Sequence, residues 1–365
     1  MQSDLLHLGW PRRRFRRTTL GVPRAAKFVF SRDVCQGRRI EWTAPHAPMK
    51  GSSQASRTTR PARHAGRLEA ARLGPREVVL SRGQHGEAGP LSRTAALERA
   101  GFRFGARGTQ SSRSIMLREV GELLRALPPE ASRADYTAAI VDDNVLAKPT
   151  GAARRATRQR LAELYALDPA VPLFRVLRRL WVLDRRSAHG RPLLALLTAL
   201  ARDPLLRLTA AHVLALAPGK ELVRADFAAA IRVATGPRFN NAVLSRVAYN
   251  AASSWSQAGH LDGRRVRCAV RPTPASVAMA LWLGETEGLA GLPMIDSWWA
   301  AVLDLSGGKM LPHAMEAARL GLIRLRAAGN VVEVSARTLD TGPWPTPGLP
   351  SRQKSYATSN LETAP

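Results

Sequence analysis

From about residue 112 onward, apolar residues recur at the spacing of amphipathic helices. The first such segment follows Ile115 and is ended by Pro128 and Pro129. Its apolar face is formed by Met116, Val120, Leu123, Leu124 and Leu127. Because this pattern returns in segment after segment, the sequence predicts a mainly α fold, a helical bundle.

Capping residues and prolines mark where the later helices begin and end. Thr150 can cap a helix that runs through Leu167, and Pro172 suits the first turn of the next one. A longer helix is predicted from about residue 240 to 258, and Gly259 is placed to end it. After it, the segment 264–272 alternates basic and apolar residues, which predicts an exposed strand.

The last patterned unit has its own order of elements. Thr273 can cap one helix, Asp296 can cap a second, and a third is predicted from about residue 309 to 320. Two apolar segments then flank a turn at Gly329 and Asn330. Three helices followed by a hairpin is the plan of a winged helix, a variant of the helix-turn-helix. The expected bundle therefore carries helix-turn-helix or winged-helix-like units and one or two short β-hairpins.

The early part of the chain lacks sustained periodicity and is rich in Arg, Gly, Pro and Ser. Such a composition predicts a disordered basic extension, and a start codon assigned too far upstream is the second interpretation. The predicted organisation is an extension over 1–105, a helical domain over 106–190, a central helical domain with the basic strand over 191–272, a winged-helix-like domain over 273–338 and a disordered tail over 339–365.

The chain has a formal net charge of +27. Residues 1–110 hold 22 basic and 7 acidic residues, and the remainder holds 33 basic and 21 acidic residues, so the patterned part is basic by itself. A protein of this charge usually has a polyanionic partner, most often nucleic acid. The arginine-rich coding bias of GC-rich genomes is the alternative explanation.

Two helices could form one cationic surface for DNA phosphates, whose contacts give a salt-dependent affinity. The other interpretation is a pair of solvated helix faces. The candidate residues on these helices are Arg154, Arg155, Arg158, Arg160, Arg175, Arg178 and Arg179.

Three further groups are candidates for DNA contact. The predicted strand could lie along a phosphate backbone, or its charges could protect a sheet edge from aggregation. Polar side chains at the end of the preceding helix can bond phosphates or base edges. The predicted wing also carries two arginines. These groups are Arg264, Arg265, Arg267 and Arg271 on the strand, Ser253, Ser254 and Gln257 on the helix, and Arg324 and Arg326 on the wing.

Signatures of other functions are missing from the sequence. There is no phosphate-binding loop, no HExxH and no GxSxG motif. Cys35 and Cys268 are too few for a disulfide framework or a zinc site, and no apolar run is long enough for a membrane span. His260 is more typical of a structural hydrogen-bonder than of a metal ligand, and Trp255 of a core residue. We therefore expect a cytoplasmic protein that is not an enzyme and has no cofactor, metal or small-molecule substrate.

Three stretches resemble the BrxA family of bacteriophage-exclusion (BREX) defence systems. They are DDNVLAKPTGAARRATRQRLAELYALDPAVPLFRVLRRLW from Asp142, NAASSWSQAGHLDGR from Asn250, and the run from Thr273 through Leu283, Gly284, Gly288, Trp298 and Asp304 to GLIRLRAAGNVVEV. The resemblance spans about residues 112–338. It implies DNA binding, a helical fold similar to the antitermination factor NusB, and the arginine-rich helix and second motif as the site.

Three hypotheses of function follow. The first is an accessory protein that binds duplex DNA. The second is an adaptor that docks a larger BREX subunit through its winged-helix unit. The third is an RNA-binding protein, which the similarity to NusB implies.

Overall fold

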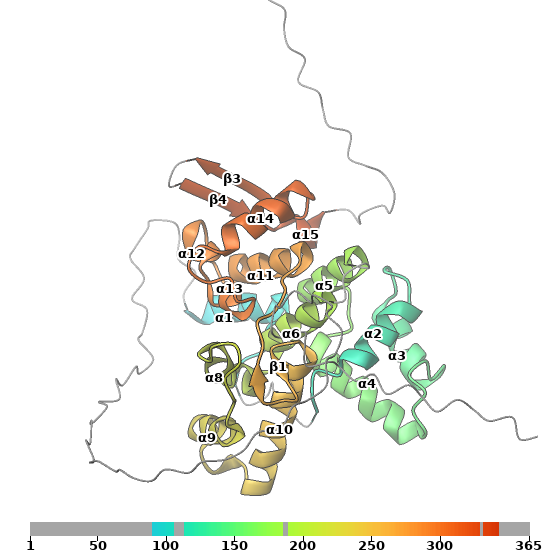
Figure 1. Cartoon of the computed structure of the whole chain (residues 1–365). Coiled ribbons are helices and arrows are strands. Elements are labelled where there is room, and N and C mark those ends of the chain that lie inside the picture. The colour runs from blue at the N-terminus through green and yellow to red at the C-terminus, as the bar shows by residue number, and fades with distance from the viewer. Residues whose placement is uncertain (1–89, 106–112, 185–188, 329–330, 343–365) are drawn as a thin grey trace, which may run out of the picture. The chain divides into compact units, whose positions relative to one another are not determined.

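The computed structural model describes residues 90–105, 113–184, 189–328 and 331–342. This part of the chain is mainly helical and has two small antiparallel sheets of two strands each, as the sequence predicts (Figure 1). None of its helices combines the length and the apolar character that crossing a bilayer requires.

The first helices begin at side-chain caps. Ser132 and Asp135 form a reciprocal capping box, and the Thr150 hydroxyl accepts the Ala153 amide at 3.1 Å. The elements are α1 (Pro90–Ala100), α2 (Leu117–Ala126), α3 (Arg133–Val141), α4 (Gly151–Tyr165) and α5 (Pro172–Leu183).

The central helices include the most buried element of the fold. Within α6 (Gly190–Arg202), the residues from Leu193 to Arg202 are all buried. Asp203 then caps the next helix by accepting the amides of Leu205 and Leu206. The following elements are α7 (Pro204–Leu208), α8 (Ala210–Leu214), α9 (Arg224–Thr235), a 3-10 helix (Gly236–Arg238), α10 (Asn241–Gln257), β1 (Leu261–Asp262) and β2 (Val266–Arg267).

The last elements follow the predicted order, with two extra short helices. They are α11 (Pro274–Thr286), α12 (Leu292–Ile295), α13 (Trp298–Val302), α14 (Met310–Arg319), β3 (Arg324–Ala328), β4 (Val331–Ser335) and α15 (Thr338–Thr341). The order of elements fits a winged helix, and the winged-helix arrangement itself stays a prediction.

One large apolar cluster contains buried residues from Phe102 to Leu339. It crosses the boundaries predicted at 190/191 and 272/273, because α6 packs against α4, α5 and α11. The three predicted helical domains therefore share this cluster, and a smaller one lies between α7, α9 and α10.

Two predictions about the chain ends were wrong in part. Residues 90–105 were expected to be disordered, yet α1 lies there and Phe102 is only 1% exposed. Residues 339–342 were expected in the disordered tail, yet Leu339 is buried. Both segments are ordered by tertiary packing, which short local patterns do not reveal. Residues 1–89 and 343–365 lie outside the described part of the chain.

Candidate nucleic-acid interface

Many arginines in this fold bond to the carbonyl groups that end helices. Arg178 donates to the carbonyls of Leu124, at 2.7 Å, and of Leu127 at the end of α2. Arg179 donates to the carbonyls of Thr338, at 2.6 Å, and of Gly342 around α15. The last carbonyls of a helix lack partners within the helix and carry the negative end of its dipole, so a guanidinium group stabilises them.

The same arrangement recurs at other helix ends. In each case the arginine belongs to another helix or strand and bonds to last-turn carbonyls. The pairs are Arg154 with Val141 of α3, Arg202 with Ala162 and Glu163 of α4, Arg191 with Trp181 of α5, Arg207 with Leu200 and Ala201 of α6, and Arg267 with Val213 of α8.

Three predicted DNA contacts are therefore wrong. Arg178, Arg179 and Arg267 are 3%, 5% and 2% exposed, respectively, so no phosphate can reach them in this structure. Arg267 also forms an ion pair with Asp304. The prediction of an exposed basic strand over 264–272 is also wrong. The strand β2 has only two residues, and the side chain of one of them, Arg267, is buried.

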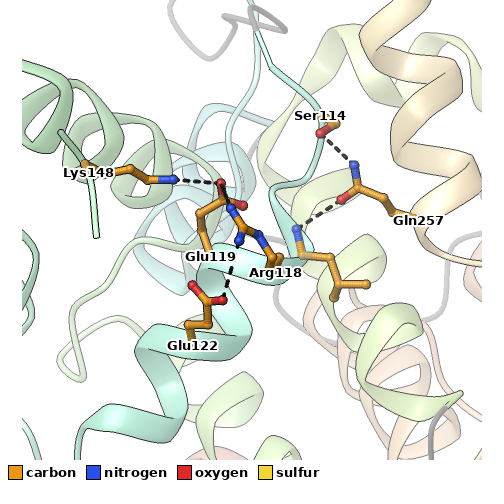
Figure 2. A network of polar contacts seen from close by, with 7 residues as sticks. Ser114, Arg118, Glu119, Glu122, Lys148 and Gln257 are labelled. Atoms are coloured by element: carbon orange, nitrogen blue, oxygen red, sulfur yellow. Dashed lines mark hydrogen bonds and ion pairs between the residues drawn. The ribbon is translucent and has the colours of Figure 1, made fainter. Parts of the chain in front are cut away.

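The polar residues near the end of α10 are mostly structural. The hydroxyl of buried Ser254 accepts the Ile115 amide at 3.1 Å, so its predicted DNA contact is also wrong. The side-chain carbonyl of Gln257 accepts the Leu117 amide at 3.0 Å, and its nitrogen donates to the Ser114 hydroxyl (Figure 2). The same nitrogen also donates to the Ser253 hydroxyl. Gln257 therefore holds the segment before α2 against α10.

The arginines of α4 and α5 do not form the expected joint surface. Arg154 donates to the Val141 carbonyl at the end of α3, and Arg160 forms an ion pair with Glu163 at 2.8 Å. Arg175 is half-buried and donates to the Pro169 carbonyl at 3.3 Å. Arg155 and Arg158 make no polar contact with other described residues, so only these two of the seven candidates are available to a ligand.

Apart from the buried Arg267, the arginines predicted on the wing and the strand are exposed, but acidic residues face two of them. Arg326 lies opposite Glu333 in the register of β3 and β4. Arg265 forms an ion pair with Glu221 at 2.7 Å. Arg324 and Arg271 are exposed. Because opposite charges neutralise each other locally, neither hairpin concentrates positive charge.

A different group of cations comes together around one exposed aromatic residue. Tyr249 on α10 is 42% exposed. The guanidinium carbons of Arg264 and Arg224 lie 4.8 Å and 6.0 Å from the centre of its ring. Arg246 lies one helical turn before Tyr249, so it shares that face of α10. We call Arg224, Arg246, Tyr249 and Arg264 the α10 surface.

The local fold explains how three elements supply this surface. The tight turn between β1 and β2 places Gly263 and Arg264 at φ of 54° and 64°. Such a left-handed turn is typical of short hairpins and aims the Arg264 side chain at α10. Both β1 and α9 pack against α10, as Figure 1 shows.

An open groove of about 660 Å³ adjoins the α10 surface at Tyr249. On one side lie the segment before α2 and the first turn of that helix, and on the other lies α10. The groove is lined by Arg113, Ser114, Met116, Leu117, Arg118, Glu119, Tyr249, Asn250, Ser253 and Gln257.

The groove's acidic residue is neutralised. Lys148 donates to Glu119 at 3.0 Å, and Arg118 lies 3.9 Å from both Glu119 and Glu122 (Figure 2). Burial opposes ionisation of Glu119, but the hydrogen bonds and cations around it outweigh burial and lower its pKa. Glu119 therefore stays ionised and paired.

The sequence-based interpretations of Trp255 and His260 are confirmed. Both side chains are buried, the Trp255 indole donates to Thr209 at 2.8 Å, and His260 Nε2 lies 2.7 Å from the Val302 carbonyl. Burial lowers the pKa of His260 to about 4, so the ring is neutral at pH 7 and Nε2 carries the hydrogen.

This histidine predicts a pH dependence of stability. Its folded pKa lies below the unfolded value of about 6.5, so stability is present above that value and is lost as the pH falls toward 4. We expect a loss of about 3 kcal/mol between pH 7 and pH 4 from this group. Urea unfolding of the wild type and of His260→Gln should show a flatter pH profile for the variant. Parallel profiles would exclude this role.

No family model, curated protein or solved structure matches this chain. Within the described residues, no cluster of histidine, cysteine, aspartate and glutamate has the grouping of a metal site. The site is therefore argued from its own geometry.

Proposed function

We propose that this chain is a non-enzymatic accessory protein that binds duplex DNA, mainly through backbone phosphates, at the α10 surface. The observation that carries the proposal is the convergence of Arg224 and Arg264, from α9 and the β1–β2 turn, on the exposed Tyr249 of α10, with Arg246 one helical turn before it. Guanidinium groups at repeated positions on one face suit the repeated phosphates of a DNA strand.

Local charge supports this choice of surface. The nearby carboxylates of Asp226 and Asp262 are exposed, and neither forms an ion pair with the three arginines among the described residues. Several arginines elsewhere, among them Arg154, Arg178 and Arg267, are engaged with helix ends or carboxylates. Free cations with a fixed orientation bind a polyanion more strongly than cations already paired.

The sequence resemblance supports the biological setting. The segment NAASSWSQAGHLDGR, one of the three BrxA-like stretches, runs from α10 into the turn that carries Arg264. We therefore propose membership of the BrxA family and a role beside larger subunits in BREX defence, where the protein would hold DNA for them.

A salt titration tests the proposal. We expect the affinity for a 25-base-pair duplex to fall linearly with salt on logarithmic axes, with a slope of about −3, because three phosphate contacts each release counterions. Fluorescence anisotropy from 50 to 300 mM NaCl measures this slope. No measurable binding at 50 mM NaCl would overturn the proposal and favour the adaptor hypothesis. Stronger binding to an RNA duplex of the same sequence would favour the RNA hypothesis.

A further inference from the structure

We propose that the groove beside α10 holds an unpaired nucleotide, so that the protein prefers duplex DNA with an adjoining single-stranded segment over continuous duplex. This inference rests on the proposed function, because the α10 surface would hold the neighbouring phosphates. It adds a ligand class for a groove that phosphate binding alone does not use.

The position of the groove is the first argument. Tyr249 belongs to the α10 surface and also lines the groove, so a strand held by the arginines would pass its mouth. The volume of the groove, about 660 Å³, lies in the range of small-molecule sites. A base in a continuous duplex is stacked and paired, so a base must leave the stack to enter such a site.

The lining of the groove is the second argument. Leu117 offers apolar surface and Tyr249 offers an aromatic ring, and the mostly buried Met116 also lines the groove. Asn250 and Ser253 offer polar groups from the same side of α10. Apolar and aromatic surface beside a few hydrogen-bonding groups is the combination that recognises an unpaired base, which has an apolar face and a polar edge.

The rigidity of the groove is the third argument. The Gln257 side chain accepts the Leu117 amide and donates to the Ser114 hydroxyl (Figure 2). These two hydrogen bonds join the segment before α2 to α10. The Tyr165 hydroxyl donates to the Ile115 carbonyl at 2.5 Å, and the Ser254 hydroxyl accepts the Ile115 amide at 3.1 Å. A site whose two walls are already joined loses little conformational entropy on binding.

The charge at the rim is the fourth argument. Arg113 is exposed at the start of this segment, and Lys148 pairs with Glu119. The carboxylate at the groove thus has its own cation, and Arg113 has no polar partner among the described residues. A phosphate attached to the bound nucleotide would find a cation there.

Paired DNA substrates test the inference on the full chain. One is a blunt duplex of 25 base pairs, and the other is the same duplex with a tail of five nucleotides that contains 2-aminopurine. We expect about tenfold tighter binding of the tailed duplex at equal salt, since one base stacked on an aromatic residue contributes about that factor. The 2-aminopurine fluorescence should change on binding.

A groove-filling variant supplies the matched control. Ser253→Phe should remove the preference for the tail and leave the affinity for blunt duplex unchanged, whereas Ala327→Phe at an exposed position of β3, outside both the α10 surface and the groove, should keep both. Circular dichroism checks that both variants fold. Equal affinity of the wild type for the two substrates overturns the inference and leaves the proposed function standing. Absence of binding to either substrate overturns both.

Discussion

Replacing Arg224, Arg246 and Arg264 together with glutamate is expected to weaken duplex DNA binding by roughly 100-fold at 100 mM NaCl. Each replacement removes a cation that faces the phosphates and adds a repelling charge. The logarithmic salt slope should become shallower by about 3, since each phosphate contact contributes about one. Fluorescence anisotropy across a salt series measures both quantities.

The control for this variant must change net charge by the same amount elsewhere. Arg155, Arg324 and Arg326 are exposed and lie on other elements, so their triple replacement with glutamate is the matched variant. We expect this control variant to lower the affinity for duplex DNA only a few-fold and to leave the logarithmic salt slope unchanged. If both triple variants lose the same affinity and slope, the whole basic surface binds DNA, and the α10 surface has no special role.

Removing a buried arginine is expected to destabilise the fold rather than to alter binding. Arg202 is 5% exposed and donates to the carbonyls of Gly101 (2.5 Å), Ala162 (3.2 Å) and Glu163 (2.9 Å). Burial lowers its pKa to about 9, so the group stays charged at pH 7. Arg202→Met leaves these carbonyls unpaired, and we expect a loss of about 3 kcal/mol in the free energy of unfolding.

Urea unfolding at pH 7 measures this loss. Arg202→Lys should lie between the wild type and Arg202→Met, because an ammonium group keeps the charge but cannot reach three carbonyls in the guanidinium geometry. Arg246→Met removes an exposed arginine and should change stability by less than about 0.5 kcal/mol. A stability of Arg202→Met equal to that of the wild type would show that carbonyl capping by this arginine does not support the fold.

The sequence predicts the helices well because their signals are local. Val120, Leu123 and Leu124 recur at helical spacing and are all buried in α2. Thr150 and Thr273 cap helices where the pattern places them. Such signals involve residues within one or two turns of each other, so one segment of sequence contains them.

The roles of the arginines depend on contacts that local patterns cannot show. Arg178 lies beside the apolar stripe of α5, which predicts an exposed cation, yet its partners lie 51 and 54 residues earlier in the chain. Arg179 bonds to carbonyls 159 and 163 residues later. Whether a charged side chain meets water or a distant helix end is decided by tertiary packing.

The candidate site did leave one signal in the sequence. Arg246, Tyr249, Asn250, Ser253 and Gln257 recur at helical spacing on one face of α10. A face that combines a cation, an aromatic ring and amides in this way is typical of a binding surface. Arg264 was already a candidate as part of the predicted strand, but its place beside Tyr249 and the contribution of Arg224 could not be predicted, since α9 and the β1–β2 turn meet α10 only in the folded chain.

Arginine modification by phenylglyoxal, read residue by residue with mass spectrometry in the absence and presence of duplex DNA, separates binding arginines from structural ones. Arg224, Arg246 and Arg264 should react in the free protein and be protected by DNA. Arg178, Arg202 and Arg267 should stay unreactive in both states because they are buried. Unchanged reactivity of the first three with DNA bound, or protection confined to Arg155 and Arg324, would contradict DNA binding at the α10 surface.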